Sequence, residues 1–379
     1  MKELALLFLK LGTISFGGPA AHIALMEEEI VKRRGWMSHE DFLDLLGATN
    51  LIPGPNSTEM AAHIGYVRGG WKGLVVSGAC FILPAASISL LLAVLYSTYG
   101  SLPRAASFIF GIRASVIAVI LASVVRLSKP RLKDHFTILL GLTVTALSML
   151  GVDEIVLLLG AGILGIAWSQ RNRLRRIPAA ALFAVPMIAP AALSSVHGSA
   201  STDPMTLTGI ALFFLKIGSV LYGSGYVLVA FLQGGLVETR HWLTQTQLLD
   251  AIAAGQFSPG PVLSTATFIG YVLSGVPGAI AATVSIFLPS FVFVLISSPF
   301  IPRLRKSPVM RGFLDGVNAA SLGLMLGVTI LLAGSSITTV PSVVIFLAAV
   351  IVLLARNVNA AWIVAGGAVL GGLLTALPL

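Results

Sequence analysis

The 379-residue sequence predicts an all-α polytopic membrane protein of about 12–13 transmembrane segments, arranged as two inverted repeats with broken helices. Three observations predict this class. The chain is 56% hydrophobic and 10% charged, with a mean hydropathy of +0.95, which leaves too little polar surface for a soluble globule. Most of the sequence matches itself at a nearly constant offset. A Pro-Gly-Pro motif interrupts an apolar segment in each half.

The apolar segments follow one another along the whole chain, each about 18 to 25 residues long, which is the length needed to cross a bilayer. They begin near residues 4, 41, 72, 104, 135, 153 and 178 in the first half and near 206, 246, 277, 310, 340 and 359 in the second. The first segment runs into Gly17-Gly18-Pro19 without a small-residue cleavage site. We therefore expect it to be retained structure and not a signal peptide.

Charge and cysteine content indicate which binding partners and cofactors the protein can have. The 24 Lys and Arg outnumber the 15 Asp and Glu, but they concentrate between apolar segments, as expected of a membrane-orientation signal and not of a nucleic-acid surface. The single cysteine, Cys80, excludes an intramolecular disulfide and a thiolate metal cluster within one chain. We predict no metal, no other cofactor and no nucleic-acid partner.

The internal repeat is the strongest signal in the sequence. "FLKLGTISFGGP" (8–19) matches "FLKIGSVLYGSG" (214–225) at an offset of 206, and the register carries Pro53-Gly54-Pro55 onto Pro259-Gly260-Pro261. After a one-residue deletion it continues at 205, where it pairs "IGY" (64–66) with "IGY" (269–271). We predict a first repeat over residues 1–180, a second over 207–379 and a connecting segment over 181–206.

Two features predict that the second repeat is inverted. The first repeat has an odd number of apolar segments. Equivalent loops also differ in charge, because four basic residues lie over 126–133 whereas the matching stretch 334–340 has none, so the two loops are expected on opposite faces of the membrane. The basic stretch 31–36 disagrees with this topology if every segment spans fully. A re-entrant Pro-Gly-Pro segment would change the count, so the number of spans stays open.

Each Pro-Gly-Pro motif should break a helix within the membrane. Proline removes an amide donor and glycine is a poor helix former, so the motif costs several kcal/mol in a helix interior. Irregular backbone at membrane depth persists only where it is packed in protein or lines a wet cavity. The half-helix that begins at Asn56-Ser57 would present free amides and the positive end of its dipole to an anion. Gly17-Gly18-Pro19 and Gly223-Ser224-Gly225 form a second matched pair of breaks. Simple kinking of the helices is the alternative.

Several ionisable residues lie inside apolar segments, where they are costly and mark functional sites. Lys10 and Lys216 each lie seven residues before a break, about 10 Å along a helix. The alternative for Lys10 is snorkelling to a headgroup. Arg113, which has Asn318 as its counterpart, fits a binding or a structural role equally.

Three acidic or imidazole side chains are candidates for carrying a coupling proton. Glu59 and His63 lie one turn apart on the half-helix after the first Pro-Gly-Pro, and histidine titrates near neutral pH. Asp44 pairs with Asp250 in the repeat and could equally form a cap or a salt bridge. Residues 26–36 are interpreted as an interfacial helix with i,i+4 pairs such as Glu28 with Lys32.

Phe16-Gly17-Gly18-Pro19 followed by His22, together with Pro53-Gly54-Pro55 after a polar residue, resembles the signature of the chromate ion transporter (CHR) family in its long two-domain form. The resemblance covers both repeats, although the second half has Gly223-Ser224-Gly225 and no following histidine. It implies proton-linked export of chromate, a tetrahedral dianion shaped like sulfate, across the bacterial inner membrane. The sequence contains no GxxxxGK[ST] loop, which argues against a built-in ATPase.

We therefore predict a transporter and not an enzyme, with a chromate-like or sulfate-like oxyanion and membrane lipid as partners and a homodimer as an open question. The predicted substrate site combines both kinds of break with nearby polar and charged residues: Lys10, Gly17, Gly18, Pro19, His22, Asn50, Pro53, Gly54, Pro55, Asn56, Ser57, Arg113, Lys216, Gly223, Ser224, Gly225, Gln256, Pro259, Gly260 and Pro261. The proton-coupling candidates are Glu59, His63 and Asp44.

Two other functions remain open at the level of sequence. A sulfate or other anion carrier or channel would use the same hydrogen-bond donors, because sulfate and chromate present the same four oxygens. An intramembrane lipid-phosphate hydrolase would need converging acids, which Glu27, Glu28 and Glu29 could supply. The aligned residues in the second repeat include Gly234 and Gly235, and the three acids adjoin the basic stretch 32–34, which argues against the hydrolase.

Overall fold

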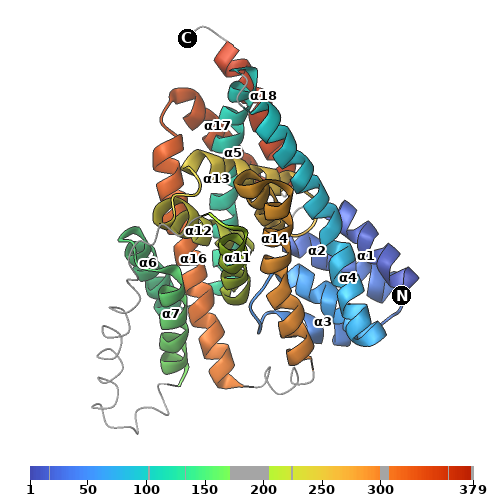
Figure 1. The fold of residues 1–379 in the computed structure, drawn as a ribbon. Helices are drawn as coiled ribbons and strands as arrows, with labels where there is room; N and C mark the ends of the chain where they lie inside the picture. Colours follow the sequence, from blue (N-terminus) through green and yellow to red (C-terminus); the bar gives the residue numbers. More distant parts are fainter. Residues whose placement is uncertain are drawn as a thin grey trace.

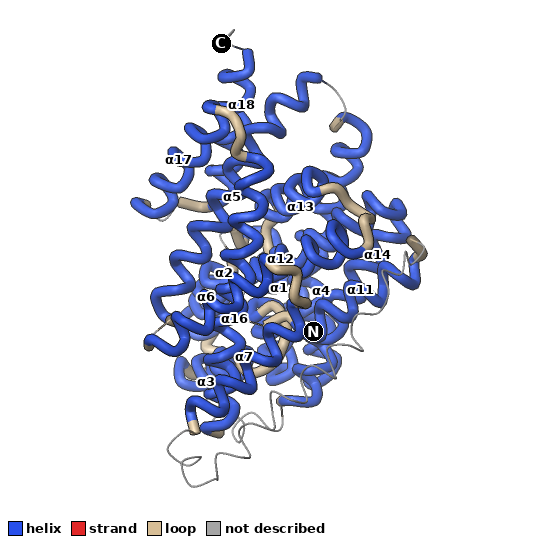
Figure 2. Tube along the Cα trace, turned by 90° about the vertical axis from the view of Figure 1, so that its left-hand side faces the viewer, coloured by secondary structure: helices blue, strands red, loops and turns tan. Residues whose placement is uncertain are grey.

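The computed structural model describes residues 1–16, 18–100, 103–132, 134–170, 205–222, 225–298, 307–356 and 358–376, and every regular element in these residues is a helix. The predicted all-α class is therefore confirmed, and Figure 2 shows helices joined by short loops. Gly17, Gly223, Ser224 and residues 181–204 of the predicted connecting segment lie outside the described residues.

The two halves have the same order of helices over most of their length. The first contains α1 (Lys2–Ile14), α2 (Pro19–Glu27), the π-helix η1 (Glu28–Arg33), α3 (His39–Thr49), α4 (Asn56–Tyr99), α5 (Pro103–Arg131), α6 (His135–Met149) and α7 (Glu154–Ser169). The second contains α11 (Leu207–Val220), η2 (Gly225–Val227), α12 (Leu228–Leu232), the π-helix η3 (Gln233–Thr239), α13 (Gln245–Phe257), η4 (Val262–Ser264), α14 (Thr265–Ser297), α16 (Pro308–Ser336), α17 (Val340–Ala355) and α18 (Ala360–Ala376).

Four helices are long and apolar enough to cross a membrane, and they lie over 56–99, 106–129, 262–297 and 309–336. Six shorter apolar helices accompany them, including α6, α7, α17 and α18. The chain is therefore a multi-pass membrane protein whose repeats also contain helices of less than spanning length. α1, α2 and α3 are such short elements: α1 and α3 end shortly before a predicted break, and α2 begins at one.

α4 and α14 are each two helices that meet at a sharp turn. Gly69 and Gly70 leave the helical region in α4, and Ser274 and Gly275 do so at the equivalent place in α14. On either side of the first turn, Gly65 and Gly73 approach so closely that a Cβ on either would overlap the carbonyl of the other. Gly270 and Gly278 repeat this contact. The half-helix after each Pro-Gly-Pro therefore folds back on the long helix that follows it.

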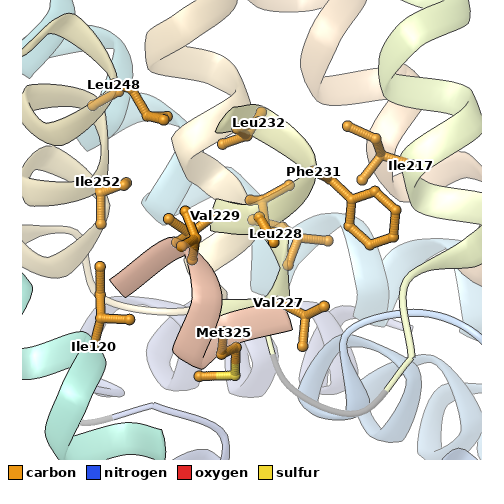
Figure 3. Close-up of a cluster of buried hydrophobic side chains, with 14 of the residues drawn as sticks. Ile120, Ile217, Val227, Leu228, Val229, Phe231, Leu232, Leu248, Ile252 and Met325 are labelled. Carbon is orange, nitrogen blue, oxygen red and sulfur yellow. The ribbon is translucent and has the colours of Figure 1, made fainter. Parts of the chain in front are cut away.

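The broken helix of the second repeat lies in the main hydrophobic core. In Figure 1, α1 to α4 lie on one flank of the molecule and α6 and α7 on the other, with α11 to α14 between them. Figure 3 shows the buried side chains of η2 and α12 surrounded by apolar residues from α5, α11, α13 and α16. Phe231 and Leu232 are at most 4% exposed. This packing fixes the segment that follows the break in the second repeat.

Candidate functional site

The four predicted breaks meet as two pairs, each formed across the repeats. The amide of Gly260 donates to the carbonyl oxygen of Ser15 at 2.7 Å, and the amide of Gly54 donates to that of Leu221 at 2.7 Å. Ser15 aligns with Leu221, and Gly54 aligns with Gly260, at the offset of 206. A contact that is exchanged reciprocally in this way indicates an approximate two-fold axis between the repeats. We call these contacts the Ser15–Gly260 pair and the Leu221–Gly54 pair.

Both Pro-Gly-Pro motifs need glycine at the centre. Gly54 has a φ of 144° and Gly260 a φ of 87°, a region that residues with a Cβ rarely adopt. A Cβ on Gly54 would also overlap the Glu59 carboxylate, and one on Gly260 would lie 3.1 Å from the Cβ of Ala85. The conformation and the close packing together explain why the motif places glycine between its prolines.

A small polar cavity adjoins the Ser15–Gly260 pair. It is lined by residues of both repeats: Ser15, Gly18, Tyr226, Gly255, Gln256, Ser258, Gly260, Val262, Asn359 and Ala360. The Tyr226 hydroxyl donates to Oε1 of Gln256 at 3.3 Å. Nε2 of Gln256 and Oγ of Ser15 are buried, and neither has a hydrogen-bond partner among the described residues. The cavity therefore contains buried donors that can bind an additional polar group.

A helix N-terminus faces this cavity, and a guanidinium lies near one of its lining residues. The guanidinium of Arg126 is close enough to Tyr226 for the two groups to interact electrostatically. η4 begins at Val262 and continues into α14 with Thr265, so the first turns carry no carboxylate. A helix start without its own acid attracts an anion. The cavity thus combines the features of an oxyanion site.

His22 supports the Ser15–Gly260 pair and does not itself line the cavity. Its Nε2 donates to the carbonyl oxygen of Ser15 at 3.1 Å, so this one oxygen receives hydrogen bonds from His22 and from Gly260. The imidazole is 1% exposed and packs edge-on against Phe81 at 5.7 Å. His22 therefore positions the end of α1 relative to the Pro-Gly-Pro motif of the other repeat.

The Leu221–Gly54 pair has a different chemistry because Glu59 lies beside it. Glu59 is 0% exposed, and neither carboxylate oxygen has a hydrogen-bond partner within the described part of the chain. Tyr222 is close enough to interact with it electrostatically, and Ser290 lies beside Glu59 on the same side of Gly54. The residue that aligns with Glu59 is the neutral Thr265. One pair therefore has an acid in the first turn of its half-helix and the other does not.

The remaining candidates near the first Pro-Gly-Pro differ in burial. His63 is 1% exposed, and its Nδ1 lies 3.3 Å from Oγ of Ser298. Nδ2 of Asn56 donates to Oδ1 of Asn50 at 2.7 Å at an exposed position, while Ser57 is buried. Asp44 is exposed on α3. Glu59 and His63 are thus the buried titratable groups here.

Lys10 lies in an ion pair and does not line the polar cavity. Its Nζ donates to Oε1 of Glu29 at 2.7 Å, and Arg34 contacts the other carboxylate oxygen. The hydrogen bond from Lys10, together with Arg34, lowers the pKa of Glu29, which lies in η1 outside the spanning segments. The predicted pair between Glu28 and Lys32 is present at 3.1 Å. The lysine of the first repeat therefore already has a buried counter-ion.

Arg113 connects the two repeats. Its Nε and Nη2 each donate to a different oxygen of Asp250 at 2.8 Å, and the Tyr96 hydroxyl donates to the same carboxylate at 2.9 Å. Asp250 is 6% exposed. Of the two roles predicted for this arginine, the geometry supports an inter-repeat ion pair. The sequence did not indicate Asp250 as its partner.

Sequence reasoning missed several residues that line the polar cavity. Ser15, Tyr226, Ser258 and Asn359 are ordinary polar residues in apolar surroundings, and the repeat aligns Ser15 with an apolar leucine. Ser15 and Ser258 could have been predicted as cavity residues from their positions next to predicted breaks. Asn359 caps α18 through the amide of Ala361, just as Asp153 caps α7. That equivalence becomes visible once the helices are aligned.

Comparisons with known proteins agree on one family. A family model described as chromate transporter matches residues 2–166 and 208–372. The chain is 34% identical to a chromate transport protein of Cupriavidus metallidurans, covering 100% of this chain and 94% of the relative. It is 33% identical to one of Pseudomonas aeruginosa (89% and 82% covered) and 31% identical to a probable chromate transport protein of Synechococcus elongatus (93% and 89%). No solved structure matches.

Proposed function

The chain belongs to the chromate transporter family, and on that premise we propose that it exports chromate across the bacterial inner membrane as a proton-coupled secondary transporter. The observation that carries this proposal is the meeting of broken helices from two repeats around a polar cavity. Discontinuous helices in inverted repeats are the means by which secondary transporters build a central substrate site.

The oxyanion binds in the cavity beside the Ser15–Gly260 pair. Ser15 and Gln256 supply hydrogen-bond donors that are otherwise without partners in the described structure. The start of η4 supplies amide dipoles, and Arg126 contributes positive potential through Tyr226. A tetrahedral dianion satisfies all of these groups at once, which repays the cost of burying them unpaired.

Glu59 carries the coupled proton. A carboxylate that is fully buried without a hydrogen-bond partner is unstable as an anion, so the conformation described here fits the protonated acid. Movement of the half-helix toward water would allow the proton to leave. Glu59 adjoins the Leu221–Gly54 pair, and the oxyanion adjoins the Ser15–Gly260 pair. Because the repeats are joined by a hydrogen bond at each pair, proton release from Glu59 is transmitted to the substrate.

The alternative hydrolase would need the acids of residues 27–29 to converge on a substrate phosphate. Glu28 pairs with Lys32, and Glu29 pairs with Lys10, Arg33 and Arg34. The acids that such an enzyme requires are thus already neutralised by neighbours, which favours the carrier.

Flux measurements in proteoliposomes test the proposal. Chromate and sulfate flux are measured with and without a pH gradient, and chromate counterflow is measured without one. We expect counterflow of chromate and acceleration of net flux by the gradient, with both lost when Pro53 and Pro55 are replaced by alanine. Flux that ignores the pH gradient would contradict proton coupling. Faster flux of sulfate than of chromate would make the protein a sulfate carrier, and phosphate release from a lipid pyrophosphate would support the hydrolase.

A further inference from the structure

A second small cavity lies on the flank of the molecule formed by α6 and α7. Its walls come from α6, α7, α12, η3 and α16, and they are Ser148, Met149, Glu154, Ala230, Gln233, Gly234, Glu238, Leu324, Gly327, Val328 and Leu331. Two of these residues are carboxylates, contributed by different repeats. The cavity is separate from the polar cavity at the Ser15–Gly260 pair, because the two share no lining residue.

The side chain of Gln233 indicates that this second cavity binds a polar group. The side chain is 5% exposed and its Nε2 donates to Oε1 of Glu238 at 3.1 Å. Its Oε1 is buried and accepts no hydrogen bond from any described residue. A buried amide oxygen left in this way needs a donor. The O–H of a protonated carboxyl or of a water molecule supplies that donor, whereas an anion does not.

The lysines of the two repeats have different counter-ions. Lys10 binds Glu29 of its own repeat at 2.7 Å, but the residue that aligns with Glu29 is Gly235. Glu154 of the other repeat lies next to this position, because its carboxylate occupies the space where a Cβ on the preceding Gly234 would stand. It interacts electrostatically with Lys216, but no carboxylate of the described chain lies within ion-pair distance of this lysine.

Charged side chains from three elements surround Glu154. Asp153 on the same helix, Glu238 on η3 and Lys216 on α11 all act on it, while α6 and α16 present no charged residue to the cavity. Protonation of Glu154 would end its repulsion by the two neighbouring acids and its attraction to the lysine. Glu29, by contrast, is fixed as an anion by direct contacts with Lys10 and Arg34.

The position of Glu154 indicates the side from which a proton would arrive. Arg126, Lys129 and Arg131 lie at the end of α5, and basic helix ends face the cytoplasm. α6 has 15 residues, so it spans about 22 Å before the turn that leads to α7. Glu154 follows that turn and therefore lies in the outer half of the bilayer, whose apolar core is about 30 Å thick.

We propose that this second cavity is the external proton-entry site of the transporter, with Glu154 as the group that binds the proton. The inference rests on the proposed function in taking the coupling ion to be a proton. A proton from external water forms an O–H bond with the Glu154 carboxylate and removes the negative charge that faces Lys216. Gln233 Oε1 accepts a hydrogen bond from the protonated acid or its water, and Glu238 lies at the exposed mouth as an acceptor.

The test compares Glu154→Gln with Asp153→Asn in proteoliposomes. Asp153→Asn is a matched control, because asparagine also caps helices and stands at the equivalent place before α18. We expect Glu154→Gln to lose acceleration of chromate flux by a pH gradient while chromate counterflow, which needs no net proton movement, persists. The control should retain both. Infrared difference spectra between acid and neutral pH should show a carboxyl band that Glu154→Gln removes.

The outcomes separate this inference from the proposed function. If wild-type flux ignores the pH gradient, the proposed function fails. Suppose instead that the pH gradient accelerates the Glu154→Gln flux as much as the wild-type flux, or that the variant retains the infrared band. Either result would overturn the proton-entry site and leave the proposed function in place. Should Glu154→Gln fail to fold, Lys216→Gln provides the second variant. Loss of the lysine charge should move the midpoint of pH dependence upward, and an unmoved midpoint would overturn the proposal.

Discussion

The amide of Gly260 donates to the carbonyl oxygen of Ser15 at 2.7 Å, and this hydrogen bond joins the end of α1 in one repeat to the Pro-Gly-Pro motif of the other. Both groups are backbone atoms that a continuous helix would have paired internally. Their pairing explains how a membrane protein tolerates two interruptions in each repeat. The hydrogen bond also forms one wall of the cavity in which we place chromate.

Replacing Gly260 with alanine should damage transport and stability together. The φ of 87° disfavours any residue with a Cβ, at a cost of about 1–2 kcal/mol, and the new methyl would lie 3.1 Å from Ala85. We expect a lower melting temperature in detergent and a loss of chromate counterflow. Gly160→Ala in α7 is the control, since a Cβ there meets nothing within 4 Å. Equal behaviour of the two variants would contradict the requirement for glycine.

Replacing Gln256 with leucine should weaken chromate binding. Leucine keeps the approximate size of the side chain but removes the amide donor that faces the cavity. We expect a KM for chromate higher by about tenfold, the effect of one lost hydrogen bond to a charged group, with sulfate inhibition weakened in parallel. The control is Gln245→Leu at the other end of α13. An unchanged KM for chromate in Gln256→Leu would show that the oxyanion binds at another site.

Breaking the pair between Arg113 and Asp250 should destabilise the contact between repeats. Asp250 is 6% exposed, and removing one partner of a buried ion pair costs about 3–5 kcal/mol. Thermal unfolding of Arg113→Gln and Asp250→Asn should show large and non-additive losses. Glu28→Gln, which breaks an exposed pair, should cost less than about 1 kcal/mol. If Arg113→Gln keeps full stability but loses chromate binding, Arg113 is a substrate ligand instead.

Replacing Glu59 with glutamine should uncouple flux from pH. Glutamine mimics the protonated acid in shape and charge, so we expect chromate counterflow to persist at every pH while the response of net flux to a pH gradient disappears. His63→Gln tests the neighbouring group, and we expect it to shift the pH midpoint and to keep the gradient response. A Glu59→Gln protein that still uses the gradient would show that another group carries the proton.

The sequence predicted the locations of the breaks but not their partners. Pro53-Gly54-Pro55 and its counterpart interrupt helices because their covalent geometry forbids regular hydrogen bonds, and this property is local. The pairing of Gly54 with Leu221 depends on how the repeats pack around their two-fold axis, which no local pattern encodes. Leu221 contributes only its backbone carbonyl oxygen, so its side chain gave no signal.

Charged residues were found by the sequence analysis, whereas their partners were not. Lys10 and Arg113 stand out in apolar segments, but Glu29 and Asp250 come from other helices and bind them. The repeat alignment was misleading here, because Asp44 aligns with Asp250 yet is exposed. The two repeats share a fold but differ in the partners of their charged residues, which the alignment does not reveal. The predicted roles of Lys10 and Lys216 in substrate binding and of Asp44 in proton coupling therefore remain predictions.

The exchange of hydrogen bonds between the repeats limits how small such a protein can be. A half-sized chain containing only one repeat would keep an unsatisfied glycine amide and an unsatisfied carbonyl inside the bilayer. Two copies facing opposite ways, joined by duplication or by assembly, would satisfy both. The stability of each half is therefore tied to the presence of the other, and a mutation at either glycine affects both repeats.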